Sequence, residues 1–223
     1  MSDDILREVD EAMRVEKAIG FWRDHGQAIM AVIALIVLGT ALHAGWKAWT
    51  FEQNQAQTGR FLEAFKSEDP AAALRKVADE PKGNVKAIAG LAAAGIAADK
   101  EEWDAAIALY TKVAADPSSP ALFREQAIVQ ATAIKMDHQK DANGQALLDE
   151  LAPVVKLEAD KSMWAGRAKL LSALIKANKM DDVEGALAEV RAIVSMKGVS
   201  ADVLGQAQML EEVYTVRMKE KKS

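Results

Sequence analysis

Residues that could do chemistry are few in this sequence, and they are scattered. The 223-residue chain has no cysteine and only three histidines, His25, His43 and His138. Without cysteine there is no thiolate metal site, no iron–sulfur ligation and no cysteine nucleophile. The histidines form no His-x-x-x-His pair, the spacing that holds zinc on one helix face. We therefore expect no catalytic residue, no metal site and no cofactor, and the sequence indicates that the chain is not an enzyme.

The glycines and charges give the same indication. No Gly-Lys-Ser/Thr phosphate loop is present, and Gly90 and Gly95 fall inside a helical pattern, where close helix packing accounts for them. The 28 Lys and Arg residues against 33 Asp and Glu residues give a formal charge of −5, which provides no positive field for nucleic acid. We expect neither a nucleic-acid partner nor a small-molecule substrate, so any function must come from surface shape.

Hydrophobic residues make up 50% of the chain but are unevenly distributed. Residues 28–46 form a run of nineteen without Asp, Glu, Lys or Arg. As a helix this run would extend roughly 28 Å, close to the hydrocarbon thickness of a bilayer. Amphipathic rings and basic side chains flank it, as the headgroup region favours; we assign these membrane-interface residues as Phe21, Trp22, Arg23, Trp46, Lys47 and Trp49.

The run is longer than the apolar region of a signal peptide, which predicts an uncleaved anchor. We predict a short cytoplasmic segment at 1–27, a transmembrane anchor at 28–49 and a helical-repeat domain at 50–223. Four basic residues precede the run and three follow within twenty residues, which favours a cytoplasmic N-terminus and a C-terminal domain outside the cytoplasm. Because the two counts are nearly equal, the reversed topology stays open.

Residues 50–223 are rich in good helix formers, and Pro, Gly and Asn fall between helix-length blocks, which predicts an all-α fold. Ala106, Ala146 and Ala186 begin similar apolar blocks forty residues apart, each after a polar turn and an Ala-rich helix. The repeated unit is therefore helix, turn, helix, and its apolar face requires neighbouring units to stack as a solenoid. We expect these three alanines to be small because the paired helices approach closely there.

The first helix of each pair is expected to line the concave side of such an array. Polar residues on these helices are the candidate protein-binding residues: Arg124, Gln130, Arg167 and Lys169, with Trp164 as an aromatic anchor. In the alternative interpretation Trp164 is buried between repeats and the charges are merely solvated.

Residues 103–117 resemble the second helix of a tetratricopeptide repeat, with the small residue at Ala106, the aromatic residue at Tyr110 and a terminal proline at Pro117. The resemblance implies a packing role for Ala106 and Tyr110. Pro153 is expected to interrupt the equivalent helix of the next unit.

The whole layout resembles the YfgM-like ancillary subunits of the SecYEG translocon. The shared features are the short acidic N-terminus, the aromatic-flanked span, a helix running past Trp46 and degenerate helical repeats to the end. The resemblance implies an inner-membrane protein with periplasmic repeats that binds the translocon and membrane-bound periplasmic chaperones, and assists proteins emerging from the channel. A chaperone-like binder of unfolded envelope clients and a cytoplasm-facing membrane adaptor remain as alternatives.

Overall fold

The structure is a computed structural model that describes residues 46, 47, 49, 51, 55–80 and 85–221. Within these residues the regular elements are all helices, which confirms the predicted all-α fold class. The chain divides into two units, Met1–Gln55 and Ala56–Ser223. The four described residues before Gln55 are helical and exposed; three of them are the predicted interface residues Trp46, Lys47 and Trp49.

The predicted transmembrane anchor at 28–49, apart from Trp46, Lys47 and Trp49, lies outside the described residues, as do Phe21, Trp22 and Arg23. In the part of the chain that the structure describes, no helix is both long enough and apolar enough to cross a membrane.

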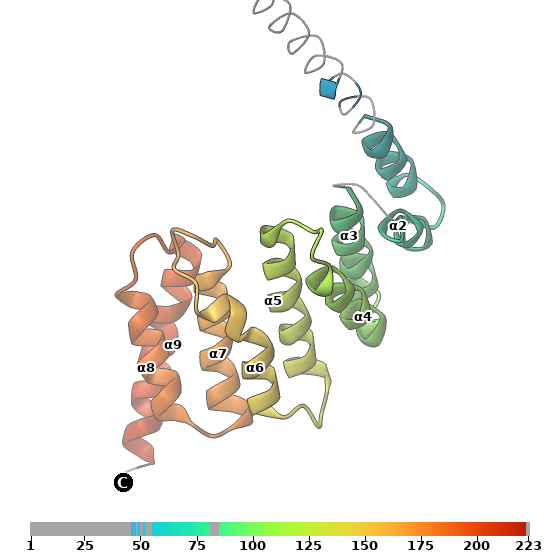
Figure 1. Ribbon diagram of the computed structural model, residues 1–223. Coiled ribbons are helices and arrows are strands. Elements are labelled where there is room, and N and C mark those ends of the chain that lie inside the picture. The colour runs from blue at the N-terminus through green and yellow to red at the C-terminus, as the bar shows by residue number, and fades with distance from the viewer. Residues whose placement is uncertain (1–45, 48, 50, 52–54, 81–84, 222–223) are drawn as a thin grey trace, which may run out of the picture. The chain divides into compact units, whose positions relative to one another are not determined.

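The second unit is a succession of helices that pack on their neighbours in sequence (Figure 1). A helical stretch at 56–65 comes first. It is followed by α2 (Pro70–Ala78), α3 (Val85–Asp99), α4 (Trp103–Ala115), α5 (Ala121–His138), α6 (Gly144–Val155), α7 (Ala165–Lys179), α8 (Val183–Val194) and α9 (Ala201–Glu220).

Two kinds of helix alternate in this array. The first helices α3, α5, α7 and α9 contact one another in succession, α3 with α5, α5 with α7, and α7 with α9. The second helices α4, α6 and α8 each pack between two first helices and make no comparable contact with one another. The described helices therefore stack as helix-turn-helix units, which is the repeat architecture that the sequence predicts.

The second helices bury the same positions. Their fourth, eighth and eleventh residues are all buried and form the row that faces the first helices: Ala106, Tyr110 and Val113 in α4, Leu147, Leu151 and Val154 in α6, and Ala186, Val190 and Ile193 in α8. Ala106, Tyr110 and Ala186 therefore lie where close packing was predicted.

The predicted packing role of Ala146 is wrong. Ala146 is the third residue of α6 and is exposed, whereas Leu147 occupies the buried fourth position. A uniform forty-residue period misses this because the spacing is 41 residues from Ala106 to Leu147 and 39 from there to Ala186. In this unit the close approach occurs at Gly144, where an added Cβ would lie 2.5 Å from Cγ of Met180.

Pro153 does not interrupt α6 either, because the helix continues through it to Val155. Proline removes one backbone N–H, which costs most in a helix interior. Here it lies in the last turn, flanked by the fully buried side chains of Leu151 and Val154, and the Lys156 N–H still donates to the carbonyls of Ala152 and Val154. Packing of the apolar row therefore holds the turn in place.

Two of the connecting turns share one backbone conformation. Glu101 before α4 and Asp181 before α8 both adopt positive φ, 61° and 53°, at the residue that precedes the helix N-cap. At the start of α8 the Asp182 carboxylate then accepts a hydrogen bond of 2.8 Å from the Gly185 N–H. This left-handed residue reverses the chain and sets α4 against α3 and α8 against α7.

Gly90 and Gly95 provide a matched test of the close packing between α3 and α4. A Cβ at Gly90 would lie 2.6 Å from Cγ2 of Val113, whereas at Gly95 the nearest atom, Oη of Tyr110, would be 3.9 Å away. We expect Gly90→Ala to lower the free energy of unfolding by about 1–3 kcal/mol through overpacking. Gly95→Ala should raise it by about 0.5–1 kcal/mol, because alanine is the better helix former. Urea unfolding of both variants checks this, and equal effects would contradict the packing of α3 on α4.

The corrected repeat alignment is tested by enlarging two alanines. Ala106→Leu places a larger side chain in a fully buried position and should destabilise the protein by about 1–3 kcal/mol. Ala146→Leu enlarges an exposed residue and should change stability by less than about 0.5 kcal/mol. A large loss of melting temperature for Ala146→Leu would restore the forty-residue alignment.

Candidate protein-binding surface

The predicted aromatic anchor lies at the start of α7 and is half-buried. Trp164 packs against the apolar cluster between α5, α6 and α7. The exposed Arg167, one turn later, places its guanidinium carbon 5.8 Å from the centroid of the Trp164 ring and donates from Nη2 to Oδ2 of Asp202 at 2.8 Å. The structure thus brings two of the predicted residues together, and Arg167 also connects α7 to α9.

A second polar contact joins the starts of α5 and α7. The buried Ser162 donates from Oγ to Oε2 of Glu125 at 2.5 Å and accepts a hydrogen bond of 3.1 Å from the Trp164 N–H. The starts of α5 and α7 form one edge of the array. The predicted binding residue Arg124 precedes Glu125 in sequence and belongs to this edge. Arg124 is half-buried, and no ion pair to it occurs among the described residues.

Gln130 and Lys169 are half-buried, and no hydrogen bond or ion pair in the described structure joins them to the other three predicted residues. Sequence reasoning missed Glu125, Ser162 and Asp202, which fix the edge. Their partners lie 35 to 37 residues away in the chain, so only the helix stacking places them together.

Two nitrogen donors at this edge have no acceptor. The indole Nε1 of Trp164 and the guanidinium Nε of Arg124 are both buried atoms with no hydrogen-bond partner. Buried donors are almost always paired, because an unpaired donor loses its hydration without compensation. Both nitrogens lack accessible surface in the described structure, so a bound chain would contact the side chains around them and not these N–H groups.

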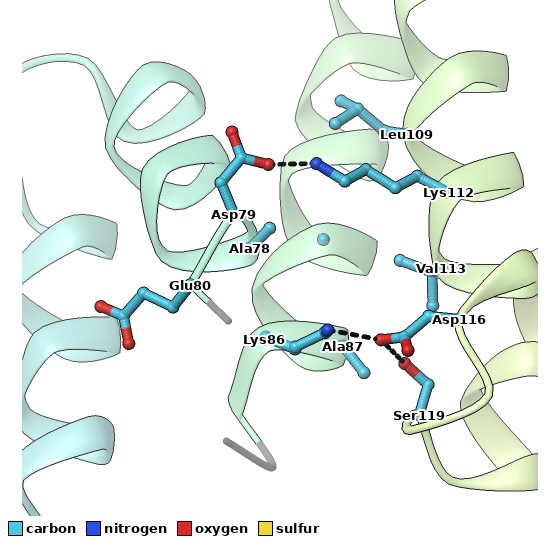
Figure 2. A pocket seen from close by; sticks show the side chains of 11 residues that line it. Ala78, Asp79, Glu80, Lys86, Ala87, Leu109, Lys112, Val113, Asp116 and Ser119 are labelled. Atoms are coloured by element: carbon cyan, nitrogen blue, oxygen red, sulfur yellow. Dashed lines mark hydrogen bonds and ion pairs between the residues drawn. The ribbon is translucent and has the colours of Figure 1, made fainter. Parts of the chain in front are cut away.

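A small cleft of about 170 Å³ lies between α2, α3 and α4 (Figure 2). Figure 2 shows two ion pairs in its lining, Lys86 Nζ to Asp116 Oδ2 at 2.7 Å and Lys112 with Asp79. The hydroxyl of Ser119 donates to the same Asp116 side chain at 3.0 Å. No histidine lines the cleft, and the described residues contain no group of three or more potential metal ligands. Four of its charged groups pair with one another and Glu80 pairs with Arg60 outside the lining, which suits a structural role.

The Asp116 carboxylate is strongly stabilised in this cleft. The Lys86 ammonium contributes most, followed by the side-chain and backbone groups of Ser118, and Ser119 adds a further hydrogen bond. Together they hold the pKa of Asp116 well below its usual value of 3.8. The carboxylate thereby fastens the turn after α4 to the start of α3.

Comparison of the chain with known protein families, with curated proteins and with solved structures finds no match.

Asp116 predicts an acid-sensitive stability. Because its pKa is lower in the folded state than in the unfolded state, its stabilising effect is complete above about pH 4 and is lost as pH falls through the lower, folded pKa. We expect Asp116→Asn to melt below the parent protein at pH 7, and the difference to shrink steadily below about pH 4. The control is Asp160→Asn, which alters an exposed carboxylate with no hydrogen bond or ion pair in the described structure. A difference for Asp116→Asn that is constant from pH 7 to pH 2 would contradict the interpretation.

Proposed function

We propose that the protein is a membrane-anchored scaffold whose helical repeats recruit partners beside a protein-conducting channel. In this proposal residues 1–27 are cytoplasmic, residues 28–49 cross the inner membrane, and a tetratricopeptide-like domain at 50–223 lies in the periplasm. There it binds the SecYEG translocon and membrane-bound periplasmic chaperones, and assists proteins emerging from the channel. The observation that carries the proposal is a stack of helix-turn-helix units following a sequence run long enough to span a bilayer.

The end of the apolar run supports the anchor. Trp46 and Trp49 are 67% and 56% exposed, and their ring centroids lie 5.8 Å apart. Large exposed indoles are costly in water but favourable at the headgroup level, where the ring and the N–H are both accommodated. Lys47 between them provides a cation for the same region, which makes the lipid bilayer a partner.

The edge formed by the starts of α5 and α7 supports protein binding. Trp164 is the kind of side chain that dominates interface energies, and the exposed Arg167 beside its ring adds a cation. Arg124 lies at the same edge and has no ion-pair partner in the described residues. The amine of Lys169 also has no ion-pair partner in the described residues. Tethering to the membrane raises the effective concentration, so individually weak contacts suffice.

One observation favours a second function. Met163 and Met209 are both strongly exposed, and flexible apolar side chains of this kind adapt to varied partners. They suit the chaperone-like alternative, in which the repeat domain holds unfolded envelope clients directly. The two functions differ in selectivity, because a scaffold captures a few membrane proteins and a client binder captures many unrelated chains.

The absence of native cysteine allows a direct test. Met163→Cys introduces a thiol beside Trp164, Asp104→Cys introduces one on the exposed face of a second helix, and Ser2→Cys reports the N-terminal side. In intact spheroplasts a membrane-impermeant thiol reagent should label the first two variants but not Ser2→Cys. A thiol-linked photocrosslinker should then capture translocon subunits or a membrane-bound chaperone from position 163 far more than from position 104.

The same experiment separates the alternatives. Labelling of only Ser2→Cys would establish the reversed topology and refute the periplasmic assignment. A broad smear of unrelated captured chains would favour the client binder. If the edge makes the contact, adding Arg124→Glu and Lys169→Glu to Met163→Cys should reduce the discrete crosslinks about tenfold without changing the melting temperature.

A further inference from the structure

The terminal helix α9 carries an apolar row on its exposed side. Met209, Val213 and Val216 are 63%, 52% and 54% exposed and follow the i, i+4, i+7 spacing of one helix face. They are distinct from the buried face of α9, where Val203, Ala207 and Tyr214 pack into the last core cluster. The helix therefore has two apolar faces, of which the described chain covers one.

The position of α9 in the array explains why the second face is open. Each earlier first helix of the described array packs on the second helix that follows it, α3 on α4, α5 on α6 and α7 on α8, while α9 packs on α7 and α8 alone (Figure 1). The outermost helix of a helical-repeat array normally has a polar outer face. A row of Met, Val and Val departs from that rule and indicates that another helix covers α9.

The repeat geometry and the charges define the covering helix. A second helix runs antiparallel to its first helix, so the open face accepts an antiparallel amphipathic helix. Glu212 and Lys219 lie two turns apart on one side of the row, both exposed, and neither forms an ion pair within the described residues. In an antiparallel pair of identical helices with its two-fold axis beside Val216, each Glu212 faces Lys219 of the other copy.

We propose that α9 is a self-association surface, on which α9 of a second copy packs antiparallel. The Val216 side chains meet at the two-fold axis, the Val213 side chains flank it, and Met209 covers each end. Two Glu212–Lys219 ion pairs close the contact along one side. Such an interface is isologous, since both copies use the same patch. In a parallel pair the two Glu212 side chains would lie on opposite sides of the contact and neither could pair with Lys219, so the charges favour the antiparallel arrangement. This inference goes beyond the proposed scaffold function and does not depend on it.

Single cysteines in the 223-residue chain test the arrangement. In the antiparallel pair Val216→Cys brings two thiols to the axis, so oxidation should give a disulfide-linked dimer. Gln206→Cys is the matched control, because Gln206 is exposed on the same helix but lies about ten residues from the axis. Its two copies would be roughly 28 Å apart along the helices, beyond disulfide reach.

Charge reversal at Glu212 and Lys219 provides the second part of the experiment. Glu212→Lys added to Val216→Cys should lower the crosslinked fraction about fivefold, and adding Lys219→Glu as well should restore it, since the ion pairs are then reversed. Absence of a Val216→Cys dimer in a protein with an unchanged melting temperature would overturn the proposal. Equal crosslinking of Gln206→Cys and Val216→Cys would also overturn it, because only a parallel or non-specific contact brings both positions together.

Discussion

Each described helix of the repeat domain depends on its neighbours to bury a row of apolar side chains. In α3 the buried residues are five alanines and Gly90, a surface so flat that α4 approaches until Val113 occupies the space of a glycine Cβ. Alanine buries little area per residue, so such a pair gains stability from closeness and number of contacts rather than from bulky side chains. The helices are stable only when they are stacked. The domain is therefore an array of packed helices and not a single core with a shell around it.

The same constraint determines which features the sequence can predict. Helix formers, breakers and the apolar row are local, and they indicate the all-α fold and the helix-turn-helix unit correctly. The exact phase of the repeat is not local: in α6 the small residue moves to Gly144 and a leucine takes the fourth position, because Met180 packs against the helix start. Period alone therefore selects Ala146, the residue next to the buried one.

The candidate binding edge at the starts of α5 and α7 shows what sequence patterns cannot predict. Trp164 and Arg167 could be nominated from residue type and helix position, and they do lie together. Their setting depends on Ser162, Glu125 and Asp202, whose partners are a whole repeat away in sequence. A serine before a helix reads as an ordinary cap, and only the stacking of α5 on α7 gives it a carboxylate partner. A sequence pattern that repeats within each unit does not indicate which residues of different units will contact one another.

These polar contacts also determine what a partner would meet. Apolar packing is not directional, so by itself it leaves neighbouring helices some freedom to shift along one another. Hydrogen bonds from α7 to α5 and from Arg167 to Asp202 on α9 remove that freedom at the ends of the first helices, where a displacement would separate the paired groups. The polar ties therefore align the first helices into one continuous surface, which is the property that a scaffold of stacked helices requires.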